Sequence, residues 1–264
     1  MSASFSEETV SVAGIDVHYY RGGEGPPLLI LHGGGGNPGW LMTHEALAAH
    51  YTVYAPSHPG FGRTPRPEWI ARPSDMGVFY LWWLQEMGLD RVRLMGHSFG
   101  GWLAADIATT CPQAVERLVL VDAVGVKPQR SDILDIFIIT PEDIRTHAFF
   151  NPPEHIPEWE RLYGREPAPE ETERAEDALE MMIRLCWKPY MHDLRLPALL
   201  PRVQSPTLVL WGREDAIVPL ECGEIYQQGI RGAQLRVIEA CGHSPHIEKP
   251  HAFAEAVLPF LAQA

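Results

Sequence analysis

The chain has 264 residues, 45% hydrophobic and 21% charged, which suits one large α/β domain with an insertion. Its formal net charge of −13 argues against a nucleic-acid partner, because phosphate binding needs clustered lysine and arginine. No apolar run approaches the ~18–20 residues of a membrane span, and the first residues show no secretory signal. The four cysteines lack metal-binding spacing, so free thiols in a reducing compartment are expected, with one disulfide pair as the alternative. These features predict a soluble, cytoplasmic protein.

Short apolar runs alternate with helix-forming segments over the first 121 residues. The ranges 9–13 and 15–20 flank Gly14 and predict a hairpin. Further strands are expected at 28–31, 51–55, 91–95 and 118–121. Helices are expected at 40–49, at 74–87 with Ser74 as N-cap, and from 102 to the Cys111–Pro112 stop. This alternation predicts right-handed βαβ crossovers, and hence a mostly parallel central sheet flanked by helices.

The alternation stops between residues 127 and 204. Helices are predicted at 131–139, 141–149 and 170–187, separated by proline-rich joints. One face of the third helix is expected to carry an apolar stripe of Ala175, Ala178, Leu179, Met182, Ile183, Cys186 and Trp187. This stripe fits packing against the sheet, the roof of a substrate pocket, or both. Strands resume at 207–211 and 234–238, followed by a helix at 251–262. The sequence thus predicts a core of 1–126 and 205–264 with a helical cap subdomain of 127–204.

Residues 96–101 read G-H-S-F-G-G and lie between a predicted strand and a predicted helix. In that context G-x-S-x-G is typical of a nucleophile elbow. Glycines at 96 and 100 avoid collisions in so tight a turn, and Ser98 is left exposed at the helix N-terminus. The helix dipole and free N–H groups there favour developing negative charge. The alternative is a glycine-rich turn with an incidental serine.

A serine nucleophile needs a base, and the base needs an orienting acid. In a strand–helix fold of this kind these partners follow later strands, in the order serine, acid, histidine. Asp215 follows the strand at 207–211, and His243 follows the strand at 234–238. Alternatives are Glu214 or Asp122 as the acid and His246 as the base, whereas His97 is expected to pack.

The glycine run at 33–36 follows a buried strand and can present N–H groups without side-chain obstruction. The amides of Gly34 and Phe99 are therefore expected to hold the oxyanion, where one donor contributes about 3 kcal/mol. The alternative is a phosphate-binding loop, but no Lys-Ser or Lys-Thr pair follows. No H-E-x-x-H pattern and no dinucleotide fingerprint occur, so neither a metal nor a cofactor is expected.

Together these pieces resemble the α/β-hydrolase family. The resemblance is carried by H-G-G at 32–34, S-H-P-G-F-G-R-T at 57–64, the elbow, W-G-R-E-D at 211–215 and G-H at 242–243. It implies the α/β-hydrolase fold with a helical cap and the triad Ser98, Asp215 and His243. Ser57 departs from the pattern, because many members have aspartate there, but that position is not catalytic.

Within the family, a serine nucleophile argues against haloalkane dehalogenases and epoxide hydrolases, in which aspartate stands there. The glycine loop and Trp40 are similar to hydrolases of meta-cleavage products, which commonly have tryptophan after the catalytic histidine and a cap arginine. Ser244 occupies the first of these places, and Arg184 is a candidate for the second. The expected activity is therefore hydrolysis of carboxylic esters or lactones through an acyl-enzyme. Carbon–carbon hydrolysis of 2-hydroxy-6-oxodienoates and a non-catalytic, hydrolase-like receptor are the alternatives.

The expected partner is a small molecule with an apolar or aromatic part. Its contacts are predicted to come from the glycine loop and the cap: Gly33, Gly35, Phe137, Arg184 and Trp187. Nothing in the sequence indicates an oligomeric state.

Overall fold

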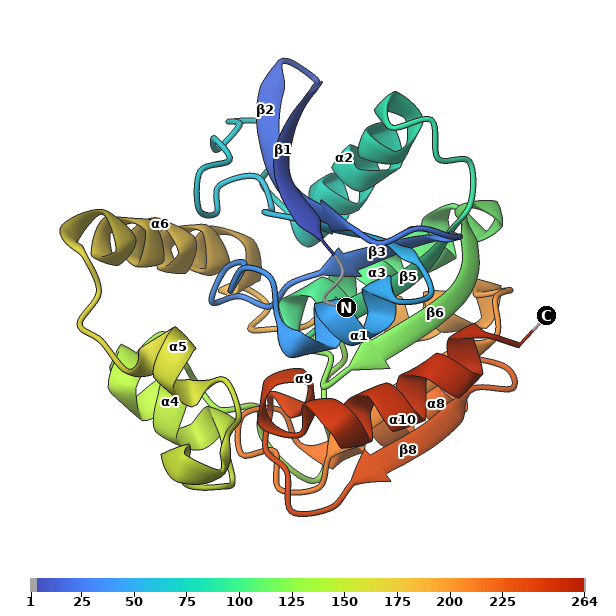
Figure 1. Ribbon diagram of the computed structural model, residues 1–264. Coiled ribbons are helices and arrows are strands. Elements are labelled where there is room, and N and C mark those ends of the chain that lie inside the picture. Colours follow the sequence, from blue (N-terminus) through green and yellow to red (C-terminus); the bar gives the residue numbers. More distant parts are fainter. Residues whose placement is uncertain (1–3, 264) are drawn as a thin grey trace.

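Residues 4–263 are described by the computed structural model. Within this range one twisted sheet of eight strands has the order β1-β2-β4-β3-β5-β6-β7-β8 (Figure 1). β2 pairs antiparallel with β1 and β4, and all other neighbours pair in parallel. The strands are β1 Phe5–Val12, β2 Ile15–Gly22, β3 Pro27–Leu31, β4 Thr52–Pro56, β5 Val92–His97, β6 Val115–Val121, β7 Thr207–Gly212 and β8 Gln234–Ile238.

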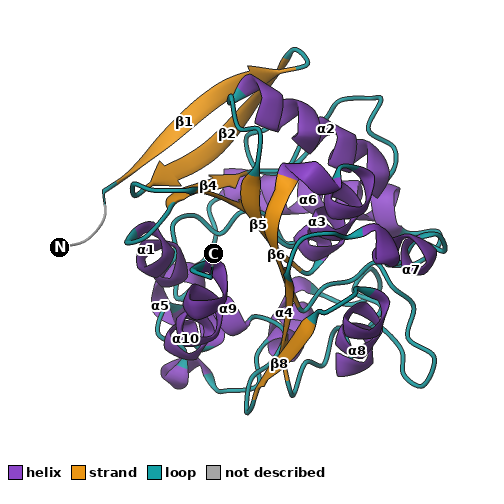
Figure 2. Cartoon of the chain, turned by 90° about the vertical axis from the view of Figure 1, so that its right-hand side faces the viewer, coloured by secondary structure: helices purple, strands orange, loops and turns teal. Residues whose placement is uncertain are grey.

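Helices cover both faces of the sheet (Figure 2). α1 (Met42–Ala48) and α10 (Pro250–Leu261) lie on one face, and α2 (Pro73–Glu86), α3 (Phe99–Thr110) and α8 (Leu220–Gly229) lie on the other. Each face has its own buried apolar cluster. Because both faces are covered, central strands such as β3 are continuous apolar runs rather than alternating ones. The predicted mostly parallel sheet flanked by helices is confirmed.

The remaining helices belong to the connections that follow β6 and β8. Between β6 and β7 the chain forms α4 (Pro141–Ala148), α5 (Trp159–Tyr163), α6 (Pro169–Cys186) and α7 (Leu196–Leu199), and α9 (Pro245–Glu248) follows β8. Short 3-10 turns occur at η1 (Pro112–Ala114), η2 (Pro153–His155) and η3 (Leu200–Arg202). None of the helices formed by residues 4–263 has the length and apolar character to cross a bilayer.

Two local predictions are wrong. Residues 131–139 form turns rather than a helix, because their backbone groups bond to distant partners. Leu134 N–H donates to the Ile217 carbonyl, and Ile136 N–H donates to the Tyr190 hydroxyl. The N-cap of α2 is Arg72, not Ser74, since the helix starts with proline at its first position.

The buried face of α6 also differs from the predicted stripe. Its buried residues are Ala178, Met181, Met182, Leu185 and Cys186. Ile183 and Trp187 are 39% and 54% exposed. Glycines in the core accommodate the two methionines: a Cβ at Gly34 would lie 3.0 Å from Met182 Sδ, and one at Gly60 would lie 3.0 Å from Met181 Sδ.

Candidate active site

Ser98 lies between β5 and α3 in a strained backbone conformation, with φ 53° and ψ −114°. The glycines on either side are required sterically. A Cβ on Gly96 would lie 2.1 Å from the Gly100 carbonyl oxygen, and one on Gly100 would lie 2.2 Å from the Leu31 carbonyl oxygen. The predicted reason for glycine at both positions is confirmed, and the strand–turn–helix context of the elbow is present.

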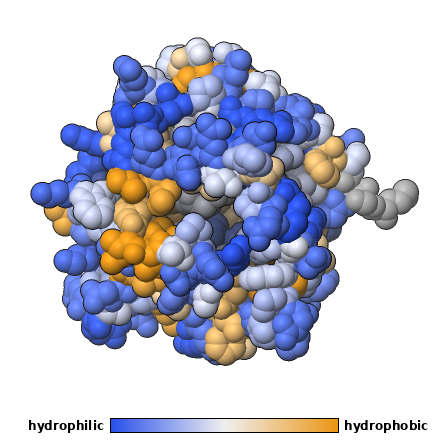
Figure 3. All heavy atoms as spheres, turned by 90° about the vertical axis from the view of Figure 1, so that its left-hand side faces the viewer, coloured by the Kyte–Doolittle hydropathy of each residue, from blue (hydrophilic) through white to orange (hydrophobic). Residues whose placement is uncertain are grey.

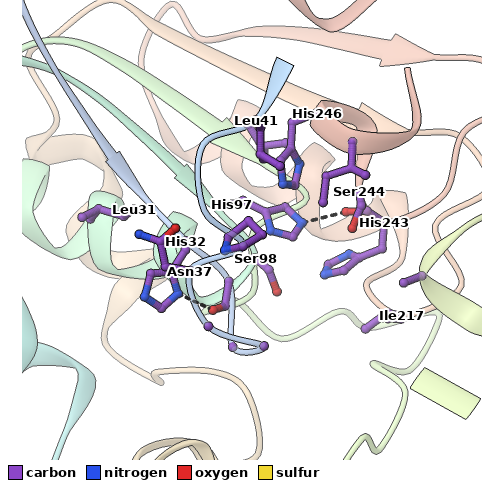
Figure 4. Close-up of a pocket in the computed structure, with 18 of the residues that line it drawn as sticks. Leu31, His32, Asn37, Leu41, His97, Ser98, Ile217, His243, Ser244 and His246 are labelled. Atoms are coloured by element: carbon purple, nitrogen blue, oxygen red, sulfur yellow. Dashed lines mark hydrogen bonds between the residues drawn. The ribbon is translucent and has the colours of Figure 1, made fainter. Parts of the chain in front are cut away.

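An aspartate and a histidine from later loops lie beside this turn. Asp215 follows β7, His243 follows β8, and Asp215 Oδ2 lies 2.8 Å from His243 Nδ1. The other oxygen, Oδ1, accepts the N–H groups of Ile217 and Val218, each at 2.8 Å. With Nδ1 donating to the carboxylate, Nε2 of the neutral ring is left as an acceptor. In Figure 4 the Ser98 hydroxyl and the His243 imidazole face one another.

The alternative acids make other contacts. Glu214 Oε2 accepts the N–H of Cys241 at 2.8 Å and so holds the loop that precedes His243. Asp122 directly follows β6, and its Oδ1 accepts the N–H of Gly212 at 2.9 Å. Asp215 is therefore the carboxylate that is hydrogen-bonded to the His243 ring.

The neighbouring histidines surround the candidate base. His97 Nε2 donates to the His243 carbonyl at 2.7 Å, and its ring centroid lies 4.9 Å from that of His243. The His246 ring lies 4.4 Å from that of His97. The His97 ring therefore contacts those of both His243 and His246.

The glycine loop lies so close to the nucleophile that a side chain at Gly33 would collide with its neighbours. A Cβ on Gly33 would lie 3.3 Å from Ser98 Cβ and 2.8 Å from His97 Nδ1. The side chain of Phe99 is fully buried, but its N–H is the first of α3 and has no acceptor within the helix. The N–H groups of Gly34 and Phe99 thus belong to the two segments that meet at Ser98.

A pocket of about 410 Å³ opens above Ser98. The segment between β6 and β7 supplies an apolar wall that includes Ile133, Leu134, Ile136, Ile144, Met182 and Met191. The core supplies Thr43, Ser98, His243, Ser244 and His246. No charged residue of the described part of the chain lines this pocket. Figure 3 shows a hollow on the face where α4 and α6 lie, with hydrophobic residues on one side of it.

The chain matches the alpha/beta hydrolase family over residues 28–256. It belongs to the α/β-hydrolase family. A 2-hydroxy-6-oxo-2,4-heptadienoate hydrolase of Pseudomonas putida is 30% identical to it, over 96% of this chain and 95% of that protein.

Two solved structures share the fold of this hydrolase. A variant of a meta-cleavage product hydrolase has a TM-score of 0.80 and 26% identity, covering 97% of this chain and 98% of its own. A bacterial membrane phospholipase A has a TM-score of 0.81 and 27% identity, covering 97% of this chain and 86% of its own.

Only part of the expected substrate contacts lie at the pocket of this hydrolase. Gly33 and Gly35 line it, whereas Phe137, Arg184 and Trp187 do not, and that expectation is corrected. The Phe137 ring packs 6.1 Å from that of Trp187. Exposed Arg184 donates to the carbonyls of Glu68 and Ile70. For Arg184 and Trp187 the cause is the orientation of α6, which buries Met181 and Met182 and leaves these two side chains exposed.

A second, polar pocket of about 370 Å³ shares residues 35–38 of the glycine loop with the first. Its cations are Arg63, which pairs with Glu7 at 2.7 Å, and Arg174 on α6. Within residues 4–263, Arg174 forms no salt bridge or hydrogen bond. Sequence reasoning missed this arginine, since the polar face of α6 reads as solvent-exposed.

We predict that alanine substitutions at two nearby glycines of the hydrolase will have unequal effects on kcat. Gly33→Ala is expected to lower kcat about tenfold or more, because its Cβ would displace Ser98 or His97. Gly35→Ala is the control, since a Cβ there meets no atom within 4 Å. Both variants are assayed for kcat, with circular dichroism to check folding. Equal activity of the two would contradict this role of the loop.

Histidine side chains buried around the site have depressed pKa values. Burial lowers the pKa of His32 and of His44 to about 4, and that of His246 to about 3. His32 Nδ1 donates to the Gly33 carbonyl at 2.7 Å, and its Nε2 accepts the His58 N–H at 2.9 Å. His32 is therefore neutral in this arrangement, and its protonation would break the bond from His58.

These histidines predict acid sensitivity of the hydrolase. Unfolded histidines bind protons below pH ~6.5, but the folded ones do so only near pH ~4, so stability falls as the pH drops between these values. His44 alone is expected to contribute about 2 kcal/mol of this loss at pH ~4.5. Urea unfolding between pH 7.5 and 4.5 measures the slope. His44→Gln should reduce the dependence of stability on pH, whereas His50→Gln, at an exposed position, should leave it unchanged. The same pH dependence in both variants would contradict the role given to His44.

One buried carboxylate joins the segment between β6 and β7 to the loop of His243. Glu248 is 3% exposed. Its Oε1 accepts the N–H groups of Phe150 at 3.0 Å and Asn151 at 2.6 Å, and its Oε2 accepts that of Gly242 at 2.7 Å. Gly242 itself leaves no room for a side chain, because a Cβ would lie 2.7 Å from the Ala148 carbonyl oxygen.

Proposed function

We propose that this chain is a serine hydrolase that cleaves a carbon–carbon bond in 2-hydroxy-6-oxodienoates. The observation that carries the proposal is the 30% identity, over nearly the full length of both chains, to a protein named for that reaction. A 2-hydroxymuconate semialdehyde hydrolase of Pseudomonas is equally similar. This substrate class takes precedence over the esters and lactones expected from the sequence.

Ser98, His243 and Asp215 would act as nucleophile, base and orienting acid. His243 Nε2 takes the Ser98 proton as the oxygen attacks the C6 carbonyl, and Asp215 stabilises the imidazolium. The N–H groups of Gly34 and Phe99 bind the oxyanion. Before this attack the 2-hydroxydienoate is converted into its 2-oxo tautomer, in which the 2-hydroxyl proton has moved to C5. The C5–C6 bond then breaks, its electron pair is delocalised onto the C2 oxygen as a dienolate, this dienolate takes up the proton from His243, and water hydrolyses the acyl group left on Ser98.

The two pockets support this substrate. We propose that residues 127–204 form a cap whose apolar wall contacts the C6 substituent, while core groups such as Thr43 and Ser244 face the dienoate. Arg174, which is near Glu171 but forms no salt bridge among the described residues, supplies a cation beside the shared loop for the carboxylate.

Ester hydrolysis is the second candidate. It is favoured by the absence of a charged residue, among those described, from the lining of the pocket above Ser98, which suits an uncharged substrate. The structural likeness to a phospholipase A also supports it. The acyl-transfer machinery would be the same, and only the leaving group would differ.

A side-by-side assay tests both candidates. We expect a higher kcat/KM on 6-methyl- and 6-phenyl-2-hydroxy-6-oxodienoates than on p-nitrophenyl acetate and butyrate. The opposite order would make the chain an esterase. A fluorophosphonate probe should label Ser98, and Ser98→Ala should abolish the labelling. No turnover of either class and no label would leave the hydrolase-like receptor.

A further inference from the structure

Asp122 lies directly beside the proposed triad, yet the proposed reaction does not use it. It follows β6, is 0% exposed and has a positive φ of 44°, which is uncommon for residues other than glycine. One ligand atom each of Asp122, Asp215 and His243 lies within 4.8 Å of the others. A second carboxyl group is therefore buried next to the acid that orients the base.

The hydrogen bonds of the two carboxyls are unequal. Asp215 accepts two backbone N–H groups at Oδ1 and the His243 ring at Oδ2. Asp122 accepts only the Gly212 N–H, at Oδ1. Its Oδ2 is buried and has no hydrogen-bond partner among the described residues. A buried carboxyl oxygen without a donor is costly as an anion, but it can donate a proton to a neighbouring carboxylate.

The charges that face Asp122 favour its neutral form. Burial raises the pKa of Asp122 well above its ordinary value, and the adjacent Asp215 and the nearby Glu248 raise it further. The Gly212 N–H opposes this effect. His243 and Cys241 are further titratable groups close by: His243 Nδ1 is bonded to Asp215, and burial raises the pKa of the Cys241 thiol and keeps it neutral. Two carboxylates this close do not both ionise readily, and Asp215 is the one with compensating donors.

We propose that Asp122 is a positioning residue that remains protonated at neutral pH and donates a hydrogen bond from Oδ2 to the Asp215 carboxylate. Asp122 thereby fixes the plane of Asp215 toward His243 without adding a second negative charge next to the base. This role rests on the triad of the proposed function but not on the choice of substrate.

The variants Asp122→Asn and Asp122→Ala distinguish a protonated Asp122, which donates a hydrogen bond to Asp215, from an ionised Asp122, which adds a negative charge. Asparagine keeps both bonds, accepting from Gly212 and donating to Asp215, and it is neutral. We expect the acid limb of the kcat/KM–pH profile to be unchanged in Asp122→Asn. In Asp122→Ala we expect kcat to fall about tenfold with little change in KM, since a charge-assisted hydrogen bond is lost. A downward shift of the limb by about one pH unit in Asp122→Asn would show an ionised Asp122 and overturn the proposal.

Infrared spectroscopy gives a readout that is independent of catalysis. At neutral pH the difference spectrum between the wild-type protein and Asp122→Asn should show the carbonyl stretch of one protonated carboxylic acid. Buried Asp106, whose pKa is raised by burial to about 7, is present in both proteins and cancels in this difference. The same infrared comparison can be made in a Ser98→Ala background, because it does not require catalysis. It therefore tests the protonation of Asp122 even if the proposed function is wrong, and the two failures can be told apart. A band unaffected by Asp122→Asn, or no band at all, would overturn the proposal even if Asp122→Ala does not fold.

Discussion

Replacing Ser98 by alanine is expected to reduce kcat/KM about 10⁴-fold or more. The hydroxyl is the only group of the proposed mechanism that forms a covalent bond to substrate, and the oxyanion donors alone give a small residual rate. The measurement is kcat/KM on the better substrate of the dienoate and ester panel, with unfolding by urea to confirm unchanged stability.

The chain offers a control for this experiment at the same pocket. Ser244 follows the proposed base and also lines the cavity. Because it is not at the elbow, Ser244→Ala is expected to change kcat/KM less than about tenfold. If Ser244→Ala abolished activity and Ser98→Ala did not, the assignment of the nucleophile would be wrong.

Asparagine at Asp215 is expected to lower kcat about 10⁴-fold with the fold intact. The amide cannot stabilise the imidazolium, and its N–H group would favour the wrong histidine tautomer. The effect should appear in kcat more than in KM, as steady-state kinetics would show.

Glu214→Gln is the matched control for the acid. Glu214 is next in sequence but accepts the Cys241 N–H, so a glutamine oxygen can replace it. We expect its kcat to remain within about tenfold of the wild type. A larger loss in Glu214→Gln than in Asp215→Asn would identify Glu214 as the acid.

The sheet could be predicted from the sequence because its buried strands are short, apolar and bounded by turn residues. The strand at 234–238 has the bounds of β8. The order of Ser98, Asp215 and His243 was informative for a similar reason. In a parallel sheet, the loops after successive strands converge at one edge, so distant residues meet there.

The segment between β6 and β7 was harder to predict because tertiary contacts decide its local structure. Residues 131–139 have a helix-like composition, but the Ile217 carbonyl and the Tyr190 hydroxyl bond to their backbone. Likewise, Gly34 and Gly60 accommodate Met182 and Met181, and this fixes the face that α6 buries. The substrate contacts expected for Arg184 and Trp187 depended on that face, whereas that of Phe137 depended on the structure of residues 131–139.

The three backbone N–H groups that donate to Glu248 come from two parts of the protein: the segment between β6 and β7, and the loop that precedes His243. Replacing the segment around Phe150 and Asn151 with that of another enzyme would remove two donors from the Glu248 carboxylate. It would therefore also alter the position of Gly242, next to His243. Exchanging specificity in this chain therefore requires moving the residues at 150–151, 242 and 248 as one unit.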